Sequence, residues 1–278
     1  MRNIFLKNGY IVLKSIFPKD KIIKLRDKIT LLSSKDFNEF ELLLDDNIQE
    51  LLLNENLIKY IREILATNSL LYYSDSSITN LTNPQKVFDR YHNDARTEYK
   101  KIPYNEEYPI IRLGIYFQDS KEFSGGLKIR EGSHKHILFK SSLYDILYQL
   151  KLIFINKIYP FNSFKLGKGI NIEIQEGDVV IWNLRTHHAG MSRRLKLFPK
   201  LCLWPLLDKL LPNSFFLPFQ YKDNRVAIFC TFAKNDMDNK HVSGYINSKA
   251  VNKRINQINL KPSLLKKLNT LQILCSKK

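Results

Sequence analysis

The chain has 278 residues and a formal net charge of +17, and 44% of its residues are hydrophobic. This apolar content is too high for a disordered protein, and ten Gly and ten Pro are too few for a collagen-like or low-complexity chain. The three Cys residues are odd in number and have no paired short spacing, which argues against a disulfide framework and a Cys-based zinc site.

Membrane and export signals are not evident in the sequence. No apolar run approaches the roughly 18 to 20 residues of a membrane span, because Lys interrupts the longest candidates. The first 16 residues carry Arg2, Lys7 and Lys14 and lack a small-residue cleavage site, so they do not resemble a signal peptide. We therefore expect a cytoplasmic protein in a reducing compartment.

The positive charge is spread along the chain. Its densest excess follows Ser248, and basic residues do not gather into one stripe interleaved with aromatic residues. This distribution favours a solvated basic surface over a nucleic-acid interface. A basic field can still steer an anionic substrate or a lipid head group toward the protein without specifying which one.

The chain opens with one strand pattern and two helical patterns. Residues 9–13 form a short β-like run, and Pro18 is well placed at the start of a helix in which apolar residues recur at helical spacing. A second helical stretch, residues 48–65, places its Leu and Ile residues on one face. We expect both helices to pack against a core.

From Leu70 the pattern changes to short apolar runs separated by polar turns, which predicts strands. The runs are Leu70–Tyr73, Val87–Tyr91, Ile111–Phe117, Leu127–Ile129, Ile172–Ile174, Val179–Trp182 and Val226–Phe232. Many short strands after a helical start indicate an α+β protein with a β-sandwich or barrel core. No repeat or flexible linker divides the chain, so we expect a single domain over residues 1–278.

Three further stretches do not fit the β series. Residues 141–155 are expected to form a helix, and residues 261–275 a terminal helix. Residues 195–221 are apolar but contain four Pro, which excludes a long regular element. We interpret this stretch as a packed insertion or a lid.

A first candidate site follows the run Val87–Tyr91. On a strand, successive side chains point to opposite faces, so His92 and Asp94 would share one side while Asn93 points away. An imidazole nitrogen and a carboxylate oxygen could then reach one cation together. One such pair also occurs readily by chance, and a surface His beside a solvated Asp is the simpler alternative.

A second candidate lies on the apolar strand that starts after Gly177-Asp178 and ends in His187-His188 and Ala189-Gly190. A jelly roll brings distant strands together, so a His 96 positions after His92 can complete a set of three ligands. Two His and one carboxylate on one face of a metal are typical of non-haem Fe(II) oxygenases. The alternative is a polar strand end that is capped by water.

A third candidate is Arg225, which directly precedes the apolar run Val226–Phe232. Its guanidinium could hold a carboxylate in a bidentate pair. Taken alone, it could equally be a surface cation at a strand end.

Together and in this order, these features resemble the phytanoyl-CoA dioxygenase family of Fe(II)- and 2-oxoglutarate-dependent oxygenases. The segments that resemble the family are residues 9–13, the helix start at Phe17-Pro18, Tyr91–Asp94, Arg112–Asp119, Ser124–His134 and Gly177–His188. Glu131 stands where the family usually has Pro. The resemblance implies a double-stranded β-helix (a cupin-like jelly roll) with flanking N-terminal and C-terminal helices.

The resemblance also implies roles for individual residues. The iron ligands would be His92, Asp94 and one of the paired histidines, and we favour His188 because small residues follow it. His187 would then point to the opposite side. His134 is expected to be structural, tying the Gly-Ser-His turn by a hydrogen bond.

For the 2-oxoglutarate carboxylate we favour Arg225, since Arg193 and Arg194 follow the paired histidines too closely. Tyr116 and Arg112 alternate onto the face opposite Leu113 and are candidates for the pocket lining, with packing and a salt bridge as the alternatives.

The implied function is that of a dioxygenase that uses Fe(II), 2-oxoglutarate and O2 to hydroxylate a C–H bond of a small-molecule or acyl-type substrate, releasing succinate and CO2. Asp94 favours hydroxylation, since related halogenases replace this carboxylate with a small residue. Two alternatives stay open: a cupin-like metal protein that does not use 2-oxoglutarate, and a basic nucleic-acid-binding protein. The substrate could be a CoA thioester, an anionic lipid precursor, an amino-acid-like metabolite or part of a saccharide.

Overall fold

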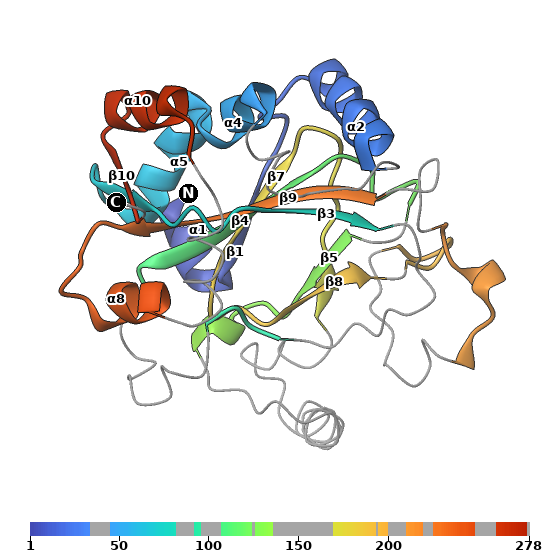
Figure 1. Ribbon diagram of the computed structural model, residues 1–278. Helices are drawn as coiled ribbons and strands as arrows, with labels where there is room; N and C mark the ends of the chain where they lie inside the picture. Colours follow the sequence, from blue (N-terminus) through green and yellow to red (C-terminus); the bar gives the residue numbers. More distant parts are fainter. Residues whose placement is uncertain are drawn as a thin grey trace, which may run out of the picture.

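Two β-sheets form the centre of the protein, which is known from a computed structural model (Figure 1). The structure describes residues 1–33, 45–81, 92–95, 107–123, 126–135, 169–192, 194–199, 210–218, 225–247 and 260–276. The predicted α+β architecture with a mainly β core is confirmed in these ranges. The predicted strand at residues 87–91 and the predicted helix at 141–155 lie outside them.

The larger sheet has seven strands in the order β1-β7-β4-β9-β2-β10, with β3 paired to β9 beside β2. All pairs in it are antiparallel except β10 with β2. Its strands are β1 (Tyr10–Leu13), β2 (Leu70–Tyr72), β3 (Ser77–Leu81), β4 (Ile110–Tyr116), β7 (Val179–Asn183), β9 (Arg225–Lys234) and β10 (Ile273–Cys275). The smaller sheet has the order β6-β5-β8, with β5 (Gly126–Ile129), β6 (Ile170–Asn171) and β8 (His188–Ser192).

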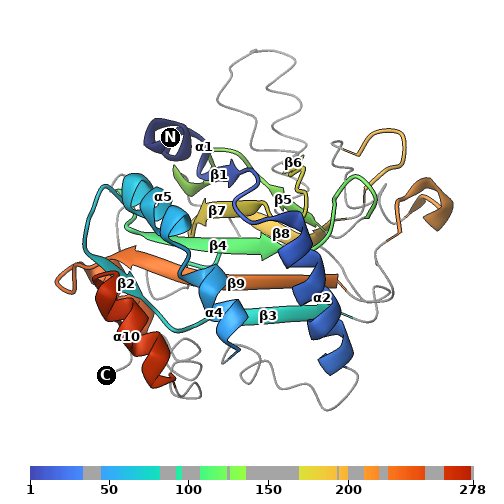
Figure 2. The ribbon, with the colours of Figure 1, turned by 90° about the horizontal axis from the view of Figure 1, so that it is seen from above.

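Helices cover the outer face of the larger sheet. Figure 2 shows α2, α4, α5 and α10 lying over this face, with the smaller sheet beyond the opposite face. The helices are α1 (Arg2–Asn8), α2 (Lys19–Ser33), α4 (Asp46–Leu52), α5 (Glu55–Leu65), α8 (Lys240–Asn247) and α10 (Pro262–Thr270), and short 3-10 helices span Ser133–Lys135 and Asn213–Phe215. None of the helices in the described ranges is long and apolar enough to cross a bilayer.

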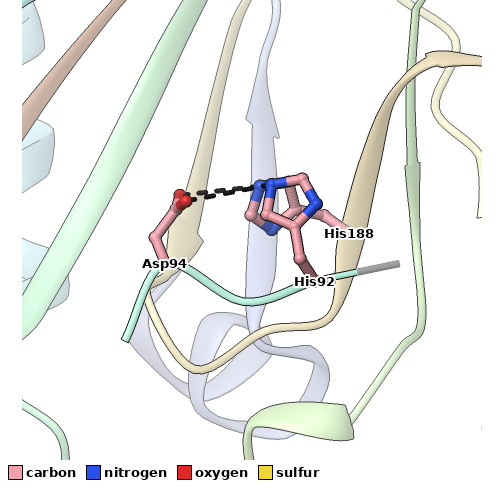
Figure 3. A group of neighbouring side chains, drawn as sticks. All are labelled: His92, Asp94 and His188. Atoms are coloured by element: carbon pink, nitrogen blue, oxygen red, sulfur yellow. Dashed lines mark ion pairs between the residues drawn. The ribbon is translucent and has the colours of Figure 1, made fainter. Parts of the chain in front are cut away.

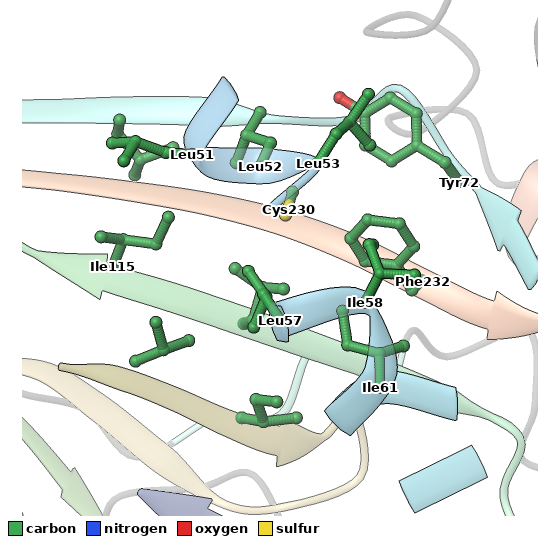
Figure 4. Packing of buried hydrophobic residues seen from close by; sticks show 14 of the residues in the cluster. Leu51, Leu52, Leu53, Leu57, Ile58, Ile61, Tyr72, Ile115, Cys230 and Phe232 are labelled. Atoms are coloured by element: carbon green, nitrogen blue, oxygen red, sulfur yellow. The ribbon is translucent and has the colours of Figure 1, made fainter. Parts of the chain in front are cut away.

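The alternation of side chains along β4 divides the core into two parts. Leu113 and Ile115 belong to the cluster under the helices, where Leu57 and Ile61 of α5 lie above the sheet (Figure 4). Tyr116 packs on the other face, in a cluster that reaches the smaller sheet. Burial of such side chains stabilises the fold by about 1.5–3 kcal/mol each. The face of the larger sheet that points toward the smaller sheet therefore has an apolar cluster of its own, separate from the core under the helices.

The predicted helix at residues 48–65 was wrong in its continuity, because the chain forms two helices there. Helix α4 ends at Leu52, and the Asn54 side chain accepts a hydrogen bond from the Leu57 backbone N–H at 3.2 Å. Asn is a favoured N-cap because its short side chain satisfies an unpaired N–H of the first turn. A new helix therefore begins immediately after it.

Other boundaries also differ from the prediction. The helix predicted over residues 261–275 ends at Thr270, and Ile273–Cys275 form β10, which pairs in parallel with β2. Residues 172–174 lie just outside β6. Helices α1 and α8 and strands β3 and β8 were not predicted from the sequence.

Gly177 occupies a turn that only glycine fits. Its φ is +90°, and an added Cβ would lie 2.1 Å from the carbonyl oxygen of Phe17. We expect Gly177→Ala to lower the free energy of unfolding by about 2–3 kcal/mol, because left-handed strain adds to a clash with backbone. Gly190→Ala is the matched control, since no atom lies within 4 Å of its Cβ position. Urea denaturation measures both; equal stability of the two variants would contradict the turn argument.

Candidate metal centre

Three side chains from distant parts of the chain meet at one point. His92, Asp94 and His188 each offer a ligand atom, and these atoms all lie within 4.8 Å of one another. Nε2 of His188 is 3.5 Å from Oδ2 of Asp94, and Nε2 of His92 is 4.0 Å from Oδ1 (Figure 3). Two imidazoles and a carboxylate form a donor set that suits a divalent transition metal.

Backbone hydrogen bonds hold the two histidine-bearing segments together. His92 and His188 form an isolated antiparallel bridge, with N···O distances of 2.9 and 2.8 Å in the two directions. The backbone N–H of Asp94 donates to the carbonyl of Leu184 at 3.0 Å. His92 and Asp94 thus lie on one side, as predicted, but Asp94 is placed by the turn before β8.

The His188 ring is held in a tautomer that suits a ligand. Its Nδ1 lies 3.0 Å from the carbonyl oxygen of Thr186, and because a carbonyl only accepts, Nδ1 carries the proton. The lone pair of Nε2 therefore faces Asp94. Burial lowers the pKa of His188, and this effect outweighs the negative charge of Asp94, which favours the protonated ring. The ring is therefore neutral at pH 7.

Asp94 supplies the negative charge. Burial alone would raise the pKa of its carboxyl, but the two neighbouring imidazoles and the Arg112 guanidinium outweigh burial and lower the pKa. Its Oδ2 is buried and accepts no hydrogen bond. An unsatisfied buried carboxylate oxygen is costly unless a charge compensates it. Oδ2 faces the His188 nitrogen and Oδ1 the His92 nitrogen, and this arrangement around a buried carboxylate fits a bound cation.

The neighbouring residues point to the other side. Nε2 of His187 lies 3.3 Å from Nδ2 of Asn93, and the His187 backbone N–H donates to Oγ of Ser133 at 2.8 Å. His134 contacts the carbonyl oxygen of Leu6 through Nε2 at 3.0 Å. Of the histidine pair, the structure therefore brings only His188 to Asp94, and His134 links its turn to helix α1.

Arg112 joins Asp94 to a second buried carboxylate, that of Asp75. Nε of Arg112 is 3.8 Å from Oδ2 of Asp94, and Nη1 donates to Oδ2 of Asp75 at 3.3 Å. The same Asp75 oxygen accepts from Oγ1 of Thr231 and from the hydroxyl of Tyr245, each at 2.8 Å. Although burial disfavours a charged Arg112, the two carboxylates raise its pKa. The guanidinium is therefore charged and connects the two carboxylates.

Asp75 was not among the predicted site residues. It follows β2 in the stretch Tyr73-Ser74-Asp75-Ser76, which has the composition of a polar turn, and no sequence signal distinguishes it from a solvated Asp. In the structure Ser74 has a φ of +53°, and Asp75 is 1% exposed. This interruption between β2 and β3 turns the carboxylate inward, beside Thr231 and Arg112.

The structure gives less information on Tyr116 and Arg225, the other predicted pocket residues. Tyr116 is buried on the inner face of β4, with Trp182 and Phe229 in the same cluster. Arg225 is the first residue of β9, paired with Leu81, and its side chain lies outside the described part. The roles of Arg225, Tyr116 and Arg112 toward a co-substrate stay predictions.

A buried cation supports the turn that carries the Leu184 carbonyl. The guanidinium of Arg185 lies over the Tyr108 ring, 4.5 Å from its centroid, and Nη2 is 3.3 Å from Nε2 of His241 on α8. The Tyr108 and His241 rings are in edge contact, with centroids 4.8 Å apart. Helix α8 thus contacts the turn at Arg185 through His241 and stabilises it.

This contact predicts a pH dependence of stability. Burial, together with the charge of Arg185, lowers the pKa of His241 from 6.5 to about 4. The unfolded chain therefore binds a proton at His241 that the folded chain does not, between about pH 6.5 and 4. The contribution of a neutral His241 is intact above pH 6.5 and lost as pH falls. We expect His241→Gln to lose less stability between pH 7 and 5 than the unsubstituted chain in urea denaturation; identical pH profiles would refute this.

Comparison with solved structures shows the fold. The chain matches the non-heme alpha ketoglutarate dependent epimerase SnoN (TM-score 0.52, 9% identity, 84% of this chain and 79% of that one). It also matches the carbocyclase SnoK (0.53, 14%, 84% and 83%) and a ThoJ–Ni complex described as a non-heme monooxygenase (0.53, 11%, 92% and 98%). The fold is cupin-like. No family profile matches the sequence, and no characterised protein matches it by sequence either.

Proposed function

We propose that the chain is an Fe(II)- and 2-oxoglutarate-dependent oxygenase of the phytanoyl-CoA dioxygenase type, built on a double-stranded β-helix. It would hydroxylate a C–H bond of a small-molecule or acyl-type substrate. The observation that carries the proposal is the convergence of His92, Asp94 and His188 on a cupin-like fold. The solved structures support it, because SnoN contains Fe3+ and alpha ketoglutarate and ThoJ contains Ni.

The residues present suit the proposed metal. His92, Asp94 and His188 would hold Fe(II), with His188 neutral and Asp94 ionised, as a cation requires. Bound iron would supply the activation of O2 that leads to succinate, CO2 and a hydroxylated product. The protein's own contribution is to fix the ligand atoms, and the contact between His188 Nδ1 and the Thr186 carbonyl contributes by setting the tautomer of the ring.

For the co-substrate carboxylate the proposal keeps Arg225, with Tyr116 in the pocket lining. Arg225 stands two residues before Ala227 on β9, and Ala227 belongs to the inner cluster that also contains Tyr116. Arg112 already contacts Asp75, Asp94 and other polar groups of the protein. In this proposal its main role is therefore to orient Asp94.

Anaerobic titration with Fe(II) and then 2-oxoglutarate tests the proposal. We expect a visible charge-transfer band in the full-length chain and succinate release once O2 is admitted. His188→Ala should give neither, while His187→Ala should retain both. Metal binding without the band and without succinate release would favour the cupin-like protein that does not use 2-oxoglutarate. Succinate release that Arg225→Ala leaves unchanged would instead remove Arg225 as the partner of the co-substrate carboxylate. Absence of metal binding would overturn the proposal altogether.

A further inference from the structure

An apolar arm projects from the end of β8. We define the apolar arm as residues 194–199 and 210–218, which are the described part of the predicted insertion (residues 195–221) together with Arg194. They are joined by a bridge between Leu195 and Phe216, by Lys196 N–H to Phe215 O at 3.0 Å, and by Leu217 N–H to Arg194 O at 2.8 Å. In Figure 1 the orange stretch of the arm stands away from both sheets at the right.

The base of the arm is fixed to the smaller sheet. Arg194 is fully buried, and its guanidinium donates to the carbonyls of Ile172 and Pro199. Nδ2 of Asn171 on β6 also donates to the Pro199 carbonyl, at 3.1 Å. A Cβ at Gly126 on β5 would lie 2.5 Å from the Arg194 guanidinium, so a larger residue there would displace the guanidinium. The arm is therefore anchored rather than loosely attached.

The outer part of the arm exposes large apolar side chains. Leu197, Leu210 and Phe198 are 82%, 70% and 62% exposed, the three highest fractions among the large hydrophobic residues that the structure describes. Phe215 is 53% exposed. Clustered exposed apolar residues mark an interaction site, because each would be stabilised by leaving water.

The charge of the arm indicates the kind of surface to which its apolar residues bind. Residues 194–199 and 210–218 contain no Asp or Glu, and of their two basic residues Lys196 is exposed while Arg194 is buried at the base. Apolar and aromatic side chains combined with Lys are typical of segments that enter the head-group region of anionic membranes. The net charge of +17 adds long-range attraction.

We propose that the apolar arm docks the protein on the surface of a bilayer that contains anionic lipids, with Leu197, Phe198, Leu210 and Phe215 inserted among the head groups. The arm follows the end of β8 opposite to His188, so it lies apart from the candidate metal ligands. Docking does not depend on the proposed oxygenase activity. The two proposals can therefore fail separately.

Vesicle co-sedimentation of the full-length chain tests this proposal. We expect binding to vesicles of phosphatidylcholine mixed with phosphatidylglycerol, weaker binding to phosphatidylcholine alone, and a decrease with salt. Phe215→Glu should lower the partition coefficient by about tenfold or more, since a charge replaces an apolar ring that the proposal places among the head groups. Met237→Glu is the matched control, because Met237 is also 53% exposed but follows β9. It should change partitioning less than twofold.

Two further measurements make the test decisive. Circular dichroism verifies that the variants fold, and F198W provides a reporter whose fluorescence should be quenched by brominated lipids. Absence of binding to the anionic vesicles at low salt overturns the proposal, as does equal partitioning of Phe215→Glu and Met237→Glu. Sedimentation velocity without vesicles tests whether the arm instead binds a second copy of the chain. If the protein does not bind vesicles but forms an oligomer that Phe215→Glu dissociates, the membrane proposal is wrong and the arm is a self-association surface.

Discussion

His188→Ala is expected to lower the affinity for Fe(II) by more than about 100-fold, whereas His187→Ala should change it only a few-fold. Loss of a direct ligand exceeds the 10–100-fold effect that is usual for residues that only support a ligand. Nε2 of His188 lies 3.5 Å from the Asp94 carboxylate, while the His187 ring faces Asn93 on the other side. The two variants remove the same chemical group from adjacent positions, so the comparison isolates the direction of the side chain.

Anaerobic calorimetry with Fe(II), repeated with Mn(II) as a redox-stable substitute, measures this difference. Asp94→Ala and Asn93→Ala form a second matched pair, with the loss expected only for Asp94→Ala. Because His187 is buried, circular dichroism must establish that its variant folds. Comparable affinities in His187→Ala and His188→Ala would remove His188 from the metal centre.

Much of the fold could be predicted because its central strands are buried on both faces. Val179–Asn183 and Arg225–Lys234 form apolar runs, and such runs predict interior strands without knowledge of their partners. Ser77–Leu81 has no such run, and its strand state depends on pairing with β9. Ile273–Cys275 continues a helical pattern, but pairing with β2 makes it a strand. Tertiary pairing, which a local pattern does not contain, decides both segments.

The residues of the candidate site likewise fall into those that a local sequence pattern predicts and those that depend on tertiary pairing. His92, Asp94 and His188 could be proposed because each lies in a short motif and the three motifs occur in a recognisable order. Asp75 has no such context, since its flanking Ser residues indicate only a turn. Its position depends on the left-handed Ser74 and on the alignment of Arg112 with Thr231 across β4 and β9. A residue such as Asp75, which contacts a candidate ligand only through another side chain, can thus be identified only when the strand register is known.

Asp75→Asn is expected to weaken Fe(II) binding by about 10–100-fold and to lower the free energy of unfolding by about 3–5 kcal/mol. The substitution keeps the shape of the side chain but leaves Arg112 with Asp94 as its one carboxylate among the described residues. The guanidinium would then compete with the metal for Asp94. Calorimetry gives the affinity, and urea denaturation without metal gives the stability.

Asp178→Asn separates the two effects of Asp75→Asn. Asp178 is also 1% exposed, but it pairs with Lys14 at 2.7 Å and with the backbone of Ser15 at 2.9 Å, apart from the metal centre. Its variant should lose stability and retain Fe(II) affinity. In a double-mutant cycle, Asp75→Asn and Arg112→Gln should be strongly non-additive for affinity, because each disrupts the same contact to Asp94. If Asp75→Asn and Asp178→Asn bind Fe(II) equally well, the Asp75–Arg112 pair stabilises the fold without orienting the ligand.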